Sequence, residues 1–234
     1  MKIVSIVCLC VVFAVSTVAA QTGSVRKEMR EAAPFTSIVA MSRINVQINH
    51  GNAGTIEVSA DESELAYVDT YVKDGTLYIG EKEKNKFRSS QPITVAVSLM
   101  SFDAITASGS GTVRGSGDFT NADAARITVS GSGNVELEFK QINKLTVGIS
   151  GSGDAILKGQ TDKFTVATSG SGDVNSFGLV TNKVIVAGSG SGDVNVSVNG
   201  PVEASLSGSG NVNYKGTATD IREHATGSGH VRKS

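Results

Sequence analysis

The chain has 234 residues, with 21 lysines and arginines, 22 aspartates and glutamates, and a formal net charge of −1. This balance disfavours a nucleic-acid partner, because nucleic acids select basic surfaces. There is no tryptophan, and the two cysteines, Cys8 and Cys10, both lie near the N-terminus. The length suffices for one large domain or two small ones.

Residues 1–20 have the pattern of a secretory signal peptide. Lys2 precedes an apolar run from Ile3 to Val15, and small residues at 18–20 favour cleavage after Ala20. The run is too short for a comfortable transmembrane helix, and no other segment is suited to span a membrane. We therefore expect a mature chain without cysteine that is secreted or resides in the cell envelope, whether in the periplasm or on the outer surface.

Residues 21–34 are polar and charged, which predicts a flexible lead-in, and residues 35–101 form an N-terminal β region. Apolar and polar residues alternate over 44–48, 56–60 and 93–99, as half-buried strands require. Between them, residues 61–68 are compatible with either a short helix or a turn. Asp74-Gly75 predicts a hairpin turn, and residues 81–90 a charged loop.

From residue 102 to 234 one phrase recurs seven times. It reads Ser-Gly-Ser-Gly followed by Thr, Asn or Asp, with Thr-Gly-Ser-Gly-His as the last copy, and starts at Ser108, Ser130, Ser150, Ser169, Ser189, Ser207 and Thr226. The starts are separated by 22, 20, 19, 20, 18 and 19 residues. A period near twenty with a turn signal in each unit predicts a stacked solenoid.

Apolar residues flank every phrase at alternate positions, for example Val147, Val166 and Val186 three residues before it. This period of two indicates short strands, and the unit is too short for two helices and a turn. The sequence therefore predicts an all-β fold, a parallel β-solenoid with about 20 residues per coil. By the same alternation, the glycines of each phrase face inward or occupy the corner, and the serines face outward.

One column of polar residues is a candidate ligand-binding surface. Asp154, Asp173 and Asp193 hold the same place in consecutive coils, and Asn134 and Asn211 hold it on either side. Stacked carboxylates about 4.8 Å apart repel one another, which a bound cation would relieve. However, Asn and Asp at turns usually bond to the backbone. Because Asn and Thr interrupt the acidic run, we favour turn chemistry and predict no metal site.

Catalytic and cofactor motifs find little support. No phrase has the lysine of a phosphate-binding loop, and a strand rather than a helix follows each phrase. The three histidines are His50, His224 and His230, and no nucleophile-elbow pattern accompanies the many serines. We therefore predict no catalytic residue, no cofactor and no enzymatic activity.

The order of motifs resembles a known family. A signal peptide is followed by Ile-x-Val-x-Ile, an Asp-Gly hairpin, Pro-Ile-Thr-Val-x-Val and serial Ser-Gly-Ser-Gly-Asp-Val phrases. This order is similar to the putative auto-transporter adhesin, head GIN domain family, over about residues 35–231. The resemblance implies a right-handed β-helix on a secreted or surface protein, and no catalytic residues to carry over.

We therefore expect an adhesin-like module that presents a regular solenoid face to an unknown glycan or protein. Two alternatives stay open: a carbohydrate-active enzyme on a β-helix, and a structural envelope protein that self-associates as a homo-oligomer. Clustered acidic residues in a deep groove would favour the enzyme, whereas a shallow, regular polar face would favour adhesion.

Overall fold

The computed structural model describes residues 24–83 and 86–234, apart from the side chains of residues 121–122. The predicted signal peptide lies outside the described residues, so its cleavage after Ala20 stays a prediction. The structure is 67% strand, and the described part has one four-residue helix, α1 (Glu62–Leu65). No helix among these residues is long and apolar enough to cross a membrane.

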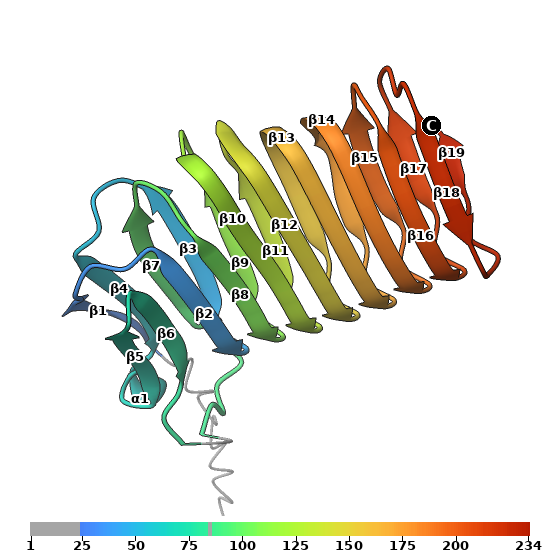
Figure 1. The fold of residues 1–234 in the computed structure, drawn as a ribbon. Helices are drawn as coiled ribbons and strands as arrows, with labels where there is room; N and C mark the ends of the chain where they lie inside the picture. The colour runs from blue at the N-terminus through green and yellow to red at the C-terminus, as the bar shows by residue number, and fades with distance from the viewer. Residues whose placement is uncertain (1–23, 84–85) are drawn as a thin grey trace, which may run out of the picture.

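Strands of consecutive coils pair in parallel and form two β-faces around a core (Figure 1). The first face leads into the Ser-Gly corners. It consists of β6 (Thr76–Glu81), β2 (Ser37–Ser42), β8 (Ala104–Gly109), β10 (Thr120–Gly131), β12 (Gln141–Gly151), the later parts of β13 (Ala155–Gly170) and β14 (Val174–Gly190), β16 (Val202–Gly208) and β18 (Ile221–Ala225).

The second face leads away from the corners. It consists of β7 (Thr94–Leu99), β3 (Asn45–His50), β9 (Thr112–Ser116), β11 (Asn134–Glu138), the earlier parts of β13 and β14, β15 (Val194–Val198), β17 (Val212–Lys215) and β19 (Val231–Lys233). The result is a parallel β-solenoid of about 6 turns with roughly 20-residue spacing, which confirms the predicted fold class.

The repeated phrases stack along one edge, as predicted. Ser130 is the register partner of Ser108 on one side and of Ser150 on the other, and Ser189 likewise joins Ser169 and Ser207. A constant register requires each coil to use the same number of residues between equivalent corners, apart from small bulges. The interval read from the sequence is therefore the length of one coil.

Each corner depends on two glycines for different reasons. Gly170, the first glycine of its phrase, has a φ of 123°, a region that residues with a Cβ rarely adopt. Gly172, the second glycine, is buried, and a Cβ there would lie 2.1 Å from the carbonyl oxygen of Gly153 in the previous coil. The neighbouring Ser171 is exposed. Gly170 is exposed and occupies the corner, whereas Gly172 faces inward and the serines face outward, in agreement with the predicted alternation.

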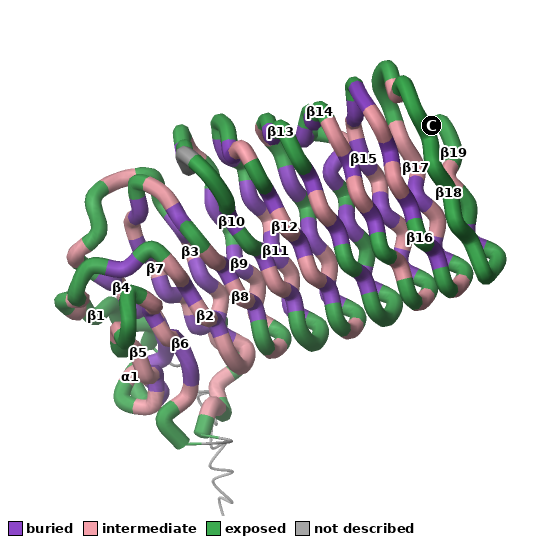
Figure 2. The backbone as a smooth tube through the Cα atoms, in the orientation of Figure 1, coloured by how far each residue is buried: buried purple, intermediate pink, exposed green. Residues whose placement is uncertain are grey.

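The core lies between the two faces and is formed by alternate residues of most of their strands (Figure 2). Val147, Val166 and Val186 are register partners with side chains at most 1% exposed. Near the first coils, Phe102 packs edge-to-face against Phe119 and Phe139, with ring centroids 5.7 and 6.5 Å apart. Aliphatic columns thus continue into a small aromatic cluster at the N-terminal side.

The N-terminal region closes that end of the solenoid with antiparallel strands. The sequence predicts a flexible lead-in at residues 21–34, but β1 (Val25–Glu31) pairs along its whole length with β4 (Thr55–Asp61). Arg30 of β1 also donates hydrogen bonds to the carbonyl oxygens of Leu65 and Val68. These backbone and side-chain bonds order a segment whose polar composition alone suggested flexibility.

The predicted hairpin is confirmed, and residues 61–68, for which the sequence allowed a helix or a turn, contain a short helix. β5 (Val68–Lys73) pairs antiparallel with β6, and Asp74 and Gly75 have φ angles of 50° and 70°, as a tight hairpin turn requires. Helix α1 begins at Glu62 and is capped by Asp61, whose side chain accepts a hydrogen bond from the Ser63 backbone.

The solenoid begins earlier than the repeats do. β2 and β3 form a coil that stacks directly on β8 and β9, so residues 37–50 belong to the solenoid rather than to a separate N-terminal region. Ser42 is the register partner of Gly109 and has a φ of 62°. This first coil escapes the repeat search because serine and isoleucine stand where later coils have glycine.

The last coil has exposed strands. Every residue of β18 is exposed, and in the described structure β18 and β19 each pair on one side only. Glu223 is the register partner of the buried Ala204, and its carboxylate lies 3.1 Å from Nδ1 of His230. Charged groups in a position that is apolar in earlier coils are expected where no further coil stacks.

Candidate binding surfaces

The five predicted ligand-binding residues lie in one column at the Ser-Gly edge. Asn134 and Asn211 flank Asp154, Asp173 and Asp193, with Asn45, Thr112 and His230 in equivalent places. We call this set the corner column. The structure thus brings together all the residues that the sequence singled out.

The Asn and Asp members of the corner column accept hydrogen bonds from the backbone of the next coil. Oδ1 of Asp154 accepts from the backbone N–H of Asp173 at 2.9 Å, and Oδ1 of Asp173 accepts from that of Asp193 at 2.7 Å. Asp193 accepts from Asn211 at 2.7 Å in the same way. The ladder satisfies corner amides that the strand pairing leaves free, which is the turn chemistry that the residue types suggested.

Beyond this ladder, ligand contact by the corner column stays a prediction. Over residues 24–83 and 86–234, no group of three or more His, Cys, Asp or Glu side chains could hold a metal ion. One oxygen of each aspartate is committed to a backbone amide, so a ligand would meet the other oxygen and the exposed serines beside it.

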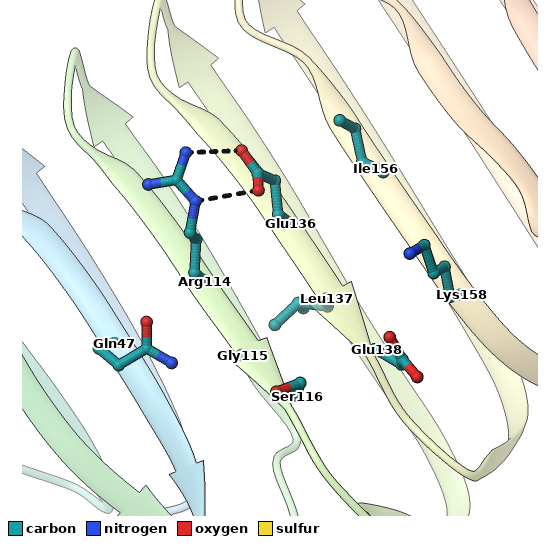
Figure 3. Close-up of a pocket in the computed structure, with 9 residues that line it drawn as sticks. All are labelled: Gln47, Arg114, Gly115, Ser116, Glu136, Leu137, Glu138, Ile156 and Lys158. Carbon is teal, nitrogen blue, oxygen red and sulfur yellow. Dashed lines mark hydrogen bonds and ion pairs between the residues drawn. The ribbon is translucent and has the colours of Figure 1, made fainter.

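A shallow groove crosses the outer surface of the second face (Figure 3). It has a volume of about 300 Å³ and spans β3, β9, β11 and β13. Alternation places its polar side chains outward, in two rows that run across the coils. It is lined by Gln47, Arg114, Gly115, Ser116, Glu136, Leu137, Glu138, Ile156 and Lys158.

A bidentate ion pair lies inside this groove. Nε of Arg114 donates to Oε2 of Glu136 at 2.9 Å, and Nη2 donates to Oε1 at 2.8 Å. These hydrogen bonds raise the pKa of the Arg114 guanidinium. The side chains remain 54% and 34% exposed, so the pair presents donors and acceptors to water.

The rest of the groove is mixed in character. Ile156 is 40% exposed and provides an apolar patch, whereas Gln47, Glu138 and Lys158 provide hydrogen-bonding groups. Glu138 and Lys158 are register partners in adjacent coils. Such a surface can bind a hydroxyl-rich or peptide-like ligand, and its shallow form leaves one side of that ligand in water.

The groove was not predicted, because its residues come from different coils. Arg114 and Glu136 are 22 residues apart, and neither belongs to the repeated phrase. Their register partnership follows once the first interval of 22 is used to align β9 with β11. The sequence therefore held a signal for the pair, but no motif that marks it as a site.

A second charged cluster has a structural explanation. The Glu64 side chain is only 2% exposed, and its carboxylate accepts bonds from the Arg43 guanidinium at 3.1 and 3.2 Å. It also accepts from the backbone amides of Arg88 and Ser89. This network fastens the charged loop after β6 to the first corner, and every buried side-chain polar atom of the described residues is paired.

The family model for the putative auto-transporter adhesin, head GIN domain, matches residues 34–218. The chain belongs to this family. The match includes the early coil β2–β3 and the repeated corners up to β17. No curated protein matches the chain.

Solved structures share the solenoid at low sequence identity. A putative adhesin from Bacteroides fragilis has a TM-score of 0.77 at 20% identity and covers 90% of this chain and 97% of its own. A putative adhesin from Parabacteroides distasonis has a TM-score of 0.68 at 22% identity, covering 91% and 98%. A putative lipid binding protein from the same species has a TM-score of 0.67 at 21% identity, and the match covers 91% of this chain and 98% of that protein. These likenesses support the fold.

Proposed function

We propose that this head GIN domain protein is an adhesin-like binding module that engages a glycan or protein through the groove of its second face. The observation that carries the proposal is the groove itself: a shallow, water-facing surface that combines the bidentate Arg114–Glu136 pair with the exposed Ile156. The open form of this groove also suits a long partner that extends beyond it.

The test is a glycan and matrix-protein array probed with the wild-type protein and two double variants. Arg114→Ala with Ile156→Ser removes the donor and the apolar contact of the groove. Arg232→Ala with Val180→Ser makes similar changes, an arginine and a β-branched apolar side chain removed, at exposed positions elsewhere. We expect the groove variant alone to lose at least tenfold in affinity, which corresponds to about 1.4 kcal/mol of binding free energy, because it lacks both the guanidinium and the apolar contact. Equal binding by all three proteins would contradict the groove assignment.

One observation favours a carbohydrate-active enzyme as the second candidate. Glu136 and Glu138 line the groove together from one face of β11, and paired carboxylates are what glycoside hydrolysis needs. Glu136, however, is held by Arg114 on both oxygens. A polysaccharide-degradation screen that finds activity in the wild type and none in Glu138→Gln would replace the binding proposal with this one.

The proposed location is the cell envelope or its exterior. The signal-peptide pattern at residues 1–20 and the family's adhesin description both support it. N-terminal sequencing of the cellular protein should find Gln21 first, and protease treatment of intact cells then separates surface from periplasm. A chain that keeps Met1 and stays in the cytoplasm would refute this location.

A further inference from the structure

Three lysines form a second repeating column, on the first face and at the margin opposite the Ser-Gly edge. Lys144, Lys163 and Lys183 are register partners in three consecutive coils, so their backbones lie about 4.8 Å apart. Lys163 is exposed, and the side chains of Lys144 and Lys183 are 62% and 38% exposed. Three ammonium groups therefore project from the same margin, one from each of three consecutive coils.

The acidic partners of this lysine column are few and lie in water. Lys144 pairs with Asp123 at 3.1 Å, and that carboxylate is 80% exposed. Lys183 pairs with Glu203 at 2.9 Å, while Lys163 between them has no ion pair within the part of the chain that the structure describes. Exposed ion pairs are weak and exchange readily for a ligand's anionic groups.

The positive field of the column reaches its neighbours. The pKa of Glu203 is lowered, first by its hydrogen bond from Lys183 and also by the charges of Arg222 and Lys163. Arg126, which is exposed, stands opposite Thr146 in the next outward row and adds a cation beside Lys144. Cations thus stand in two neighbouring outward rows of this margin.

The surface beside the column has room for a chain to lie along it. The next outward row contains Thr146 and Thr165, which are register partners and offer hydroxyl groups. One row further, a Cβ added to Gly148 would have no atom within 4 Å. The row nearest the lysines has threonines and Ile185 rather than aromatic rings, so it lacks the stacking platforms on which single-stranded nucleic acids depend.

We propose that the lysine column binds a linear anionic polysaccharide, which lies along the solenoid axis and places one carboxylate or sulfate near each coil. Only a ligand with regularly repeated charge engages all three ammonium groups; a single small anion meets one or two. The proposal rests on the proposed glycan-binding function but uses the opposite face from the groove. Its ligand class is polyuronate or sulfated glycan.

The test measures binding of the full chain to heparin, to polygalacturonate and to neutral dextran at rising salt concentration. The test variant is Lys144→Gln, Lys163→Gln and Lys183→Gln together. The matched control is Lys27→Gln, Lys215→Gln and Arg232→Gln, which removes the same charge from β1 and from strands of the second face. Far-UV circular dichroism checks that each variant is folded.

We expect the wild type and the control to bind at least one polyanion, and neither to bind dextran. The test variant should bind at least about tenfold more weakly, and its slope of log affinity against log salt should be shallower by about 2–3. The two polyanions separate a carboxylate ligand from a sulfate ligand.

Three outcomes would overturn the proposal: no polyanion binding by the wild type at low salt, equal losses in test and control variants, or single-stranded DNA binding as tight as that of the polysaccharides. If neutral glycans bind through the groove and polyanions do not bind at all, the lysine-column proposal is refuted and the groove proposal stands. Polyanion binding that survives the groove variant would support the column even if the groove proposal fails.

Discussion

Truncating Val166 tests the assignment of inward and outward positions on which the surface proposals depend. Val166 is fully buried between Val147 and Val186 in the inward column. Val166→Ala removes two methyl groups, which costs about 1.6 kcal/mol of transfer free energy at about 0.8 kcal/mol each. The cavity left behind raises the loss in unfolding free energy to about 2–3 kcal/mol.

Val180 provides the matched control, because it is 44% exposed and its substitution by alanine removes the same atoms. We expect Val180→Ala and Ser171→Ala to change stability by no more than about 0.5 kcal/mol. Val166→Asp should cost at least about 5 kcal/mol, since a buried carboxyl without a partner adds a desolvation penalty to the lost packing.

The assay is thermal and urea unfolding followed by far-UV circular dichroism. For a chain of this size 1 kcal/mol corresponds to about 2–4 °C in Tm, so Val166→Ala should melt roughly 5–10 °C below the wild type. The two exposed variants should remain within about 2 °C. Equal shifts for Val166→Ala and Val180→Ala would refute the assignment of this row to the core.

Three further predictions concern the corners and the N-terminal helix. Gly172→Ala should destabilise the protein by about 1–3 kcal/mol in urea unfolding, because its Cβ would meet the Gly153 carbonyl oxygen, whereas Ser171→Ala should not. The double variant Asp173→Asn with Asp193→Asn keeps an oxygen acceptor at each position, so its stability should equal that of the wild type. Millimolar calcium should change the Tm of neither protein. A calcium-dependent rise in Tm that is seen in the wild type and lost in the variant would make the column a metal site. Hydrogen bonds from the Ser63 hydroxyl and backbone, and from Ser89, lower the pKa of Asp61 below its usual 3.8. Because the pKa of Asp61 is lower in the folded state, its carboxylate stabilises the fold above a pH of about 3.8, and this contribution is lost as the pH falls through the folded pKa. The difference in Tm between the wild type and Asp61→Asn should therefore shrink on acidification.

The fold was predictable because its signals are local and repeated. Alternation around Val147 and Val166 identifies strands, and the interval between serines sets the coil length without knowledge of any distant contact. The corner column follows from the same count. These features need only that each coil satisfies the same geometry as the one before it, which the repeated phrase expresses directly.

What the sequence did not reveal depends on contacts between coils or on departures from the phrase. Ser42 takes a left-handed backbone conformation where later coils have glycine, so the first coil lacks the marker. The corner opposite the phrases is held by Thr161 and Thr181, whose buried hydroxyls donate to the carbonyl oxygens of Lys163 and Lys183. That corner lacks the repeated phrase, and its sequence signals are single glycines such as Gly159 and the recurring Asn-Lys and Asp-Lys steps.

The division between inward, corner and outward positions also explains where function can change without loss of the fold. Inward residues such as Val166 support packing, and Asp173 at the corner is committed to a neighbouring amide. Outward residues such as Ile156 and Lys163 carry little of the stability, because their side chains remain in water. A ligand surface on this solenoid therefore has to be assembled from outward rows of neighbouring coils, and both the groove and the lysine column have that form.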